Sequence, residues 1–253
     1  MTPGLRLTDR DAQLLEFAAE HRLVLAVHAQ ALVGTSHDAA ERRLRMLAGA
    51  GLLVRRARFQ GQPGCFHITK RGLAATGSEL PVPREDLRCY AHDVGIAWLW
   101  LAAARGALGP TRAIVSERRM RSLDGAAEPD AERHGVRLGG LGPGGLERRH
   151  YPDLLLIRPD GSRVAIELEL SAKGRVRREG ILAAYGADPR IRSVLYLTDR
   201  PAVARTISSS AAGLGLASIV HVQRLSWGGP RPGLTREARA LARTREPERA
   251  VAR

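Results

Sequence analysis

The residues best suited to chemistry lie between Tyr151 and Lys173, where carboxylates and a lysine occur at regular spacing. Asp153 opens one β-rich run, and Glu167 and Glu169 alternate with apolar residues in the next run. Because alternate residues of a strand point to the same face, both glutamates share one face. Three converging carboxylates suit a hard cation such as Mg²⁺ or Mn²⁺, which can activate water and stabilise charge on a phosphate.

The segment between the two runs has the composition of a tight turn. It reads Arg158-Pro159-Asp160-Gly161-Ser162, in which Pro presets φ and Gly accepts a positive φ. The sequence therefore predicts a hairpin, across which Asp153 can approach the face that holds Glu167 and Glu169. The alternative is an edge strand whose acidic face is only solvated.

The order of these residues resembles the motif of the PD-(D/E)xK nuclease fold: Pro152-Asp153, then Glu167-x-Glu169 on the next strand, then Lys173. Glu169 stands where that motif has its lysine. The resemblance implies that Asp153 and Glu167 hold the metal and that Glu169 is a third or water-mediated ligand. It also implies that Lys173 orients or activates the attacking water. Glu117, on or just past a strand expected at 112–121, is implied as an outer ligand.

The lysine content favours a special role for Lys173. The chain has 40 Lys and Arg residues, of which only Lys70 and Lys173 are lysines. Arginine cannot supply a compact, titratable ammonium, so a lysine kept in an arginine-rich chain points to a need for that group.

The bulk composition indicates a polyanionic partner. The 253 residues carry a formal net charge of +14, with a sequence pI near 11.2, and 44% of them are hydrophobic. This excess of basic residues favours nucleic acid, above all double-stranded DNA, as the first choice of partner and an anionic membrane as the second. No apolar run reaches the roughly 18 residues of a membrane span, and the start of the sequence lacks a signal-peptide pattern. We therefore expect a cytoplasmic protein that does not enter a membrane.

The N-terminal part, residues 1–77, has the order of a winged helix-turn-helix. Three helices are expected at 8–20, 25–33 and 36–48, followed by strands at 52–59 and 65–69 and a helix from 70 to 76. We expect basic side chains of the third helix to face the DNA groove or its phosphates: His37, Arg42, Arg43 and Arg45. The strand after it supplies residues that track the backbone: Arg55, Arg56 and Arg58. The alternatives are a solvated helix face or a protein–protein module.

The rest of the chain predicts a second domain at 91–227 behind a Pro-containing linker at 78–90. Its expected elements are helices at 92–105, 173–185 and 201–214 and strands at 112–121, 151–157, 163–171, 191–198 and 217–225. A Gly-rich stretch at 122–149 is expected to be a mobile insertion, and 228–253 a basic, disordered tail. The fold class is α/β (α+β), a mixed sheet flanked by helices, which is the order of the PD-(D/E)xK core.

A winged helix joined to such a core, with His92 opening its first helix, resembles the replication-relaxation family of bacterial plasmids and integrated mobile elements. The resemblance implies DNA binding in the replication, mobilisation or control of an element. The leading hypothesis is a protein that finds a DNA site and nicks or cleaves it with a bound metal. The alternative is a non-catalytic winged-helix regulator whose second domain serves dimerisation or DNA contact. Since winged-helix regulators usually dimerise, we expect a homodimer.

Overall fold

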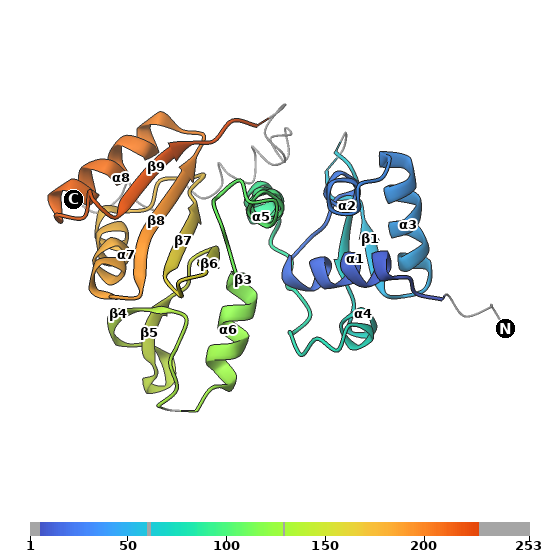
Figure 1. Cartoon of the computed structure of the whole chain (residues 1–253), viewed down its shortest axis with the longest axis horizontal. Coiled ribbons are helices and arrows are strands. Elements are labelled where there is room, and N and C mark those ends of the chain that lie inside the picture. Colours follow the sequence, from blue (N-terminus) through green and yellow to red (C-terminus); the bar gives the residue numbers. More distant parts are fainter. Residues whose placement is uncertain (1–5, 60–61, 129, 228–253) are drawn as a thin grey trace, which may run out of the picture. The chain divides into compact units, whose positions relative to one another are not determined.

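The computed structural model describes residues 6–59, 62–128 and 130–227. Within them the chain divides into two compact units, with the division after Leu101 (Figure 1). The sequence places this boundary earlier, in the linker at 78–90. The difference arises because Leu80 of that linker, and Ala97 and Leu101 of the following helix, are buried in the core of the first unit. The tail expected at 228–253 lies outside the described residues.

The first unit begins with three helices that start and end at capping residues. They are α1 (Asp9–Glu20), α2 (Ala26–Val33) and α3 (His37–Gly49). Thr8 and Asp11 form a capping box at the start of α1. Gly34 ends α2 in the left-handed conformation, and Ser36 caps α3 through its side chain. These short-range signals are visible in the sequence, and the predicted helices are confirmed.

A two-stranded antiparallel hairpin follows these helices, as the sequence predicts. It consists of β1 (Leu53–Arg56) and β2 (Cys65–Ile68), with β1 shorter than the expected 52–59. An isolated antiparallel bridge between Val24 and Phe66 ties the segment before α2 to the hairpin. The unit continues with α4 (Lys70–Ala75), the 3₁₀ turn η1 (Leu87–Cys89) and the start of α5 (Tyr90–Ala104).

The second unit is built on a five-stranded mixed sheet in the order β3-β6-β7-β8-β9. These strands are β3 (Ala113–Ser116), β6 (Leu154–Ile157), β7 (Arg163–Leu168), β8 (Ile191–Thr198) and β9 (Val220–Arg224). The pairs β3–β6 and β6–β7 are antiparallel, whereas β7–β8 and β8–β9 are parallel. Each parallel pair is joined by a crossover helix, α7 (Arg175–Ala187) or α8 (Pro201–Gly213). Their inward residues, such as Leu182 and Ile207, pack with one face of the sheet in a single core.

The expected mobile insertion at 122–149 is wrong, because this stretch forms regular structure that packs on the second unit. It contains the end of α6 (Glu117–Ala126), strand β4 (Val136–Leu141), the turn η2 (Pro143–Gly145) and strand β5 (Glu147–His150). Strands β4 and β5 pair with each other, and Val136 is buried in the core with 1% of its surface exposed. The side chain of Asp124 accepts the backbone N–H groups of His134 and Gly135, which fixes the entry to the hairpin.

The sequence thus predicts a mixed α+β chain correctly, with errors at individual residues of the elements. The helix expected at 173–185 begins at Arg175, and Val176 in its first turn is 88% exposed. Ile181 and Ala184, further along the helix, are buried. In the described part of the chain, no helix has both the length and the apolar character needed to cross a membrane.

Candidate functional site

The β6–β7 hairpin brings Asp153 to Glu167, as the sequence predicts. Leu154 pairs with Ile166, and continuing this antiparallel register by one residue sets Asp153 opposite Glu167. The Asp153 carboxylate accepts the backbone N–H of Leu168 at 2.7 Å. The turn that joins the strands contains Gly161 with a φ of +83°, a conformation that other residues rarely adopt. The hairpin therefore holds Asp153 against the end of β7.

Glu167 is buried and is held by two polar side chains. Only 3% of its surface is exposed, so the alternative of a solvated acidic face is wrong. His150, at the end of β5, places Nε2 at 2.6 Å from Glu167 Oε1. The hydroxyl of Tyr185 on α7 donates a hydrogen bond to the same oxygen. A buried carboxylate needs such partners, because burial without them is costly. We name Asp153, Glu167, Glu169 and Lys173 the acidic centre.

Glu169 follows β7, lies on the same face as Glu167, and forms an ion pair with Lys173. It is buried, with 6% of its surface exposed. Burial raises the pKa of Glu169, Lys173 opposes this shift, and the negative charges of Glu167 and Asp153 add to it. The net pKa of Glu169 is raised even though it has a lysine partner. The three carboxylates are therefore close enough to repel one another, as the strand alternation predicts.

Lys173 lies two residues before α7 and within electrostatic reach of all three carboxylates. Burial alone lowers the pKa of Lys173, but the charges of Glu167, Glu169 and Asp153 outweigh burial and raise it. The side chain is therefore an ammonium at neutral pH. An ammonium can hold a water or stabilise negative charge, and it cannot accept a proton. The motif implies that Lys173 either orients the attacking water or takes a proton from it. A protonated Lys173 fits the first role better than the second.

The centre is not pre-assembled as a metal cage. Among the described residues, no group of three or more His, Cys, Asp or Glu side chains is arranged to hold a metal ion. Oxygen atoms of the carboxylates contact protein groups, including the Lys173 ammonium at Glu169. A cavity of about 10 Å³, room for about one water, lies beside Glu169 and Lys173. Any metal would have to compete with these contacts.

Glu117 lies just past β3, at the first position of α6, and its backbone and side chain have different partners. Its backbone N–H donates to the carbonyl of Asp153 at 3.1 Å. Its side chain accepts a hydrogen bond from Arg121 at 2.9 Å, one turn further along α6. The backbone of Glu117 therefore helps to fix Asp153, while its carboxylate takes part in an ion pair on the helix.

Sequence reasoning missed His150 and Tyr185, both of which bond to Glu167. A signal for His150 exists, because it lies three residues before Asp153 at the start of the motif. Tyr185 had no such signal, since it sits at a core position of α7 and its hydroxyl reaches Glu167 only through the fold. Its complete burial raises the pKa of Tyr185 well above its ordinary value, so the hydroxyl remains a donor.

On the first unit, Arg43 has a structural role and was wrongly predicted to face DNA. Its guanidinium makes a bidentate contact with Asp11 of α1, a carboxylate with 0% of its surface exposed. Burial raises the pKa of Asp11, but the bonds from Arg43 and Thr8 outweigh burial and lower it. Arg43 therefore ties α3 to α1 instead of reaching for a ligand.

The other residues predicted to bind DNA are exposed or half-buried, and most lie in ion pairs. Arg45 and Arg55 contact Glu41 at 2.8 and 3.6 Å. Arg56 and Arg58 contact Glu85. His37 lies 3.6 Å from its neighbour Asp38. Arg42 is exposed on α3, and none of the ion pairs within the described residues includes it.

No protein-family model matches the sequence, and a search of curated proteins finds no significant similarity.

Proposed function

We propose that this protein binds DNA through its first unit and nicks or cleaves it, with a divalent cation, at the acidic centre of its second unit. One observation carries the proposal: the β6–β7 hairpin gathers Asp153, Glu167 and Glu169 around a single ammonium, Lys173. The sheet supports it, because a mixed sheet flanked by helices is what the PD-(D/E)xK resemblance implies.

The donor set of the acidic centre fits Mg²⁺ or Mn²⁺. All three acids offer carboxylate oxygens, the ligands that hard cations prefer. Burial raises the pKa of Glu169, and the charges of Glu167 and Asp153 add to this shift, so the ion pair with Lys173 does not bring it down to its ordinary value. Asp153 and Glu167 would hold the ion, with Glu169 as a third or water-mediated ligand. When bound, such an ion supplies an activated water and stabilises charge on the phosphate.

The remaining side chains position these ligands. His150 and Tyr185 hold one oxygen of Glu167 and so fix the direction of its carboxylate. The N–H of Leu168 does the same for Asp153. Lys173, kept protonated by the surrounding carboxylates, orients water or stabilises negative charge as it develops on a phosphate.

The acidic centre is tested by nicking of supercoiled plasmid with purified full-length protein. We expect nicking in Mn²⁺ or Mg²⁺, none in EDTA, and loss of nicking in Asp153→Asn and Glu167→Gln. Asp160→Asn, which changes an exposed acid at the tip of the same hairpin, should nick like the wild type. Nicking that persists in Asp153→Asn would show that this centre is not the source of the activity.

DNA binding is assigned to the first unit, which we infer to be a winged helix. The support is three helices followed by the β1–β2 hairpin, with the isolated Val24–Phe66 bridge linking the segment before α2 to the hairpin. Exposed arginines lie on both α3 and β1, among them Arg42 and Arg55. Arg42→Ala should weaken binding to double-stranded DNA and reduce its dependence on salt. Unchanged affinity and unchanged salt dependence would show that α3 does not face DNA.

The resemblance to the replication-relaxation family enters here as part of the proposal. On this basis the protein would act as a cytoplasmic homodimer in the replication or mobilisation of an element. The dimer is tested by sedimentation of the full-length protein with and without DNA. A monomer under both conditions would remove this element of the proposal.

A second candidate keeps the DNA binding and drops the cleavage. It is favoured because protein groups already bond to two carboxylates of the acidic centre. Lys173 pairs with Glu169, and His150 and Tyr185 bond to Glu167. In this version the protein is a winged-helix regulator whose second unit serves dimerisation or DNA contact. Metal-independent DNA binding without any nicking, in a protein that loses binding in Arg42→Ala, would establish it.

A further inference from the structure

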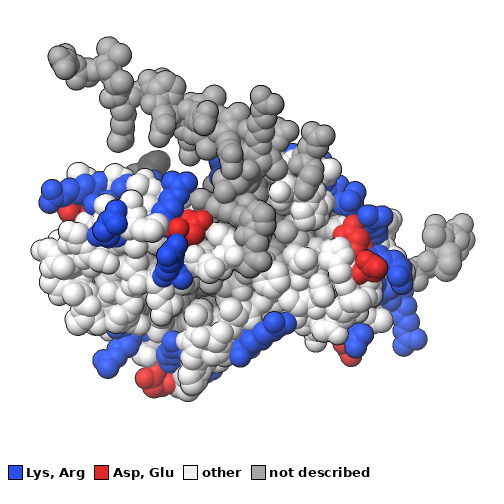
Figure 2. All heavy atoms as spheres, turned by 90° about the horizontal axis from the view of Figure 1, so that it is seen from above, with Lys and Arg blue, Asp and Glu red and all other residues white. Residues whose placement is uncertain are grey.

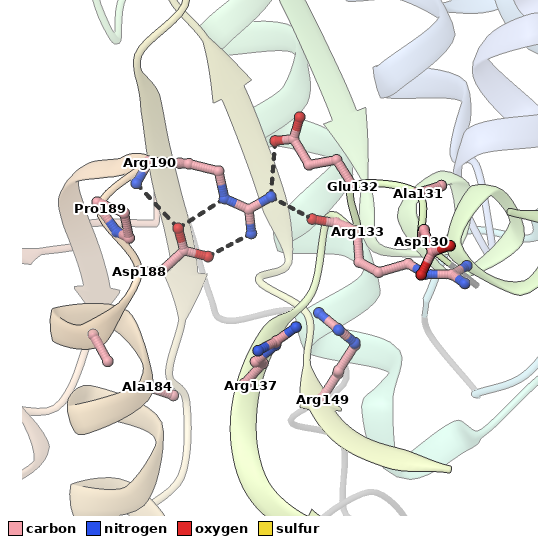
Figure 3. A pocket seen from close by; sticks show the side chains of 11 residues that line it. Asp130, Ala131, Glu132, Arg133, Arg137, Arg149, Ala184, Asp188, Pro189 and Arg190 are labelled. Atoms are coloured by element: carbon pink, nitrogen blue, oxygen red, sulfur yellow. Dashed lines mark hydrogen bonds and ion pairs between the residues drawn. The ribbon is translucent and has the colours of Figure 1, made fainter. Parts of the chain in front are cut away.

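Arginines line two hollows of the second unit, and in the first of them Arg190 is held by acidic partners. This first hollow, of about 550 Å³, is lined by Arg133, Arg137, Arg149 and Arg190 beside Asp130, Glu132 and Asp188. Figure 3 shows Arg190 bonded on one side to Asp188 and on the other to Glu132 and the carbonyl of Arg133. Bonding to Asp188 raises the pKa of Arg190 further. Its guanidinium is therefore committed to structure.

The second hollow, of about 700 Å³, lies between α7 and α8, and we name it the α7–α8 hollow. Three arginines line it against a single glutamate, Glu179: they are Arg175, Arg178 and Arg205. Three hydroxyl groups complete the polar lining: those of Thr206, Ser209 and Ser210. Guanidinium and hydroxyl groups are the common protein partners of phosphate oxygens.

The arginines at the rim of this hollow are available to a ligand. Arg205 is exposed on α8, and none of the ion pairs within the described residues includes it. Arg175 is 81% exposed at its side chain and pairs with Glu179 one turn away at 2.8 Å. An exposed pair of this kind contributes little to stability, so its guanidinium can be exchanged to a phosphate at small cost. The rim therefore presents two exposed positive charges.

Arg178 connects the α7–α8 hollow to the acidic centre. Its guanidinium donates to the hydroxyl of Ser210 at 2.9 Å and to the carbonyl of Lys173 at 3.0 Å. Arg178 and Thr206 also line the small cavity beside Glu169 and Lys173. A phosphate bound in the hollow would thus lie next to the centre to which we assign cleavage.

We propose that the α7–α8 hollow binds the phosphodiester backbone of a polynucleotide, beside the phosphate presented to the acidic centre. This inference rests on the proposed function, which makes the polynucleotide the substrate. The residues that line the hollow include no aromatic side chain on which a base could stack, which favours the backbone over a free nucleotide. On the face shown in Figure 2, the visible basic side chains lie in several separate groups.

The test is the double variant Arg175→Gln/Arg205→Gln in the full-length protein. Binding to a labelled duplex oligonucleotide is measured by fluorescence anisotropy in EDTA, over a range of salt concentrations. Loss of one or two phosphate contacts should lower the slope of log affinity against log salt by about 1 to 2. Both arginines are exposed, and melting curves check that the variant is folded. Arg177→Gln is the matched control, because Arg177 is exposed on α7 and does not line the hollow.

The outcomes separate this inference from the proposed function. If wild-type protein nicks plasmid while the double variant binds DNA with the wild-type salt slope, the hollow is not a DNA contact and the inference alone fails. A reduced slope in a protein that never nicks supports the hollow and refutes cleavage. A final experiment adds a deoxynucleoside monophosphate as a competitor. If, at sub-millimolar concentration, it removes the difference in DNA binding between the wild type and the double variant, the site takes free nucleotides and the polynucleotide assignment is overturned.

Discussion

The two units both bury ionisable groups between their elements, but they neutralise them differently. In the first unit, buried Asp11 meets one arginine and its pKa is lowered. In the second unit, buried Glu169 meets one lysine, yet its pKa is raised, because burial and two neighbouring carboxylates outweigh that lysine. A buried acid with a lowered pKa stabilises the fold in its charged form. A buried acid with a raised pKa is strained in its charged form, and a bound cation would relieve that strain.

The largest expected effect is a loss of stability of the first unit in acid, because this unit also buries a neutral histidine. Burial lowers the pKa of His28 to about 3, and its Nδ1 accepts the backbone N–H of Leu25 at 3.2 Å. A histidine whose folded pKa is depressed contributes stability above its unfolded pKa and loses it as pH falls toward the folded pKa. Between pH 6.5 and 3 the first unit should lose on the order of 4 kcal/mol from this group. Hydrogen exchange measured separately for the two units should show that the first unit opens before the second as the pH falls.

His28→Leu is the variant that tests this assignment. It removes the titration and should flatten the pH dependence of unfolding between pH 6.5 and 4.5. His67 keeps part of the dependence, since burial lowers its pKa as well. At neutral pH the variant should lose about 1 kcal/mol with the hydrogen bond to Leu25. The same slope in the variant and the wild type would contradict the role of His28.

The next largest effect should separate two adjacent arginines of α3. Arg43→Ala leaves Asp11 as a buried charge without its partner and should cost about 3 kcal/mol of unfolding free energy. Arg42→Ala should change stability by less than about 0.5 kcal/mol while weakening DNA binding. Urea unfolding and DNA titration of both variants check this contrast. If Arg43→Ala is as stable as Arg42→Ala, the ion pair with Asp11 does not hold the helices together.

This pair of arginines shows why part of the site could not be predicted from the sequence. The three helices of the first unit and the β6–β7 hairpin follow from residues a few positions apart, so they were predicted correctly. Ion-pair partners lie far away along the chain: Arg43 and Asp11 are separated by 32 residues. The sequence alone does not distinguish an arginine that stays exposed on a helix from one that the fold pairs with a distant acid.

The same reason explains the error at 122–149. Composition alone suggests that a Gly-rich stretch cannot bury enough apolar surface, and Leu141 and Leu146 are indeed exposed. What composition does not reveal is that Val136 enters a core formed by distant helices and strands. The residues that pack around Val136 come from the rest of the unit, so the local sequence could not reveal its burial.

Asp124 provides the test of that packing. It accepts the backbone N–H groups of His134 and Gly135, and these bonds lower its pKa against the effect of burial. Asp124→Ala leaves these donors unsatisfied and should cost about 2 kcal/mol. Asp130→Ala, at an exposed position of the same segment, should have almost no effect. Thermal unfolding of the two variants should differ accordingly, and equal melting temperatures would show that the segment does not stabilise the unit.

The smallest effect should come from Tyr185, and it should depend on metal. Tyr185→Phe removes the hydrogen bond to Glu167 and should cost about 1 kcal/mol in EDTA, where the carboxylate relies on protein partners. With a cation bound, Glu167 gains another partner, so Mn²⁺ should recover part of the loss in melting temperature. Tyr196→Phe is the matched control, because Tyr196 is buried beside Glu167 on the neighbouring strand. If Mn²⁺ moves the melting temperature of none of the three proteins, with DNA present or absent, the acidic centre binds no metal and the regulator becomes the better account.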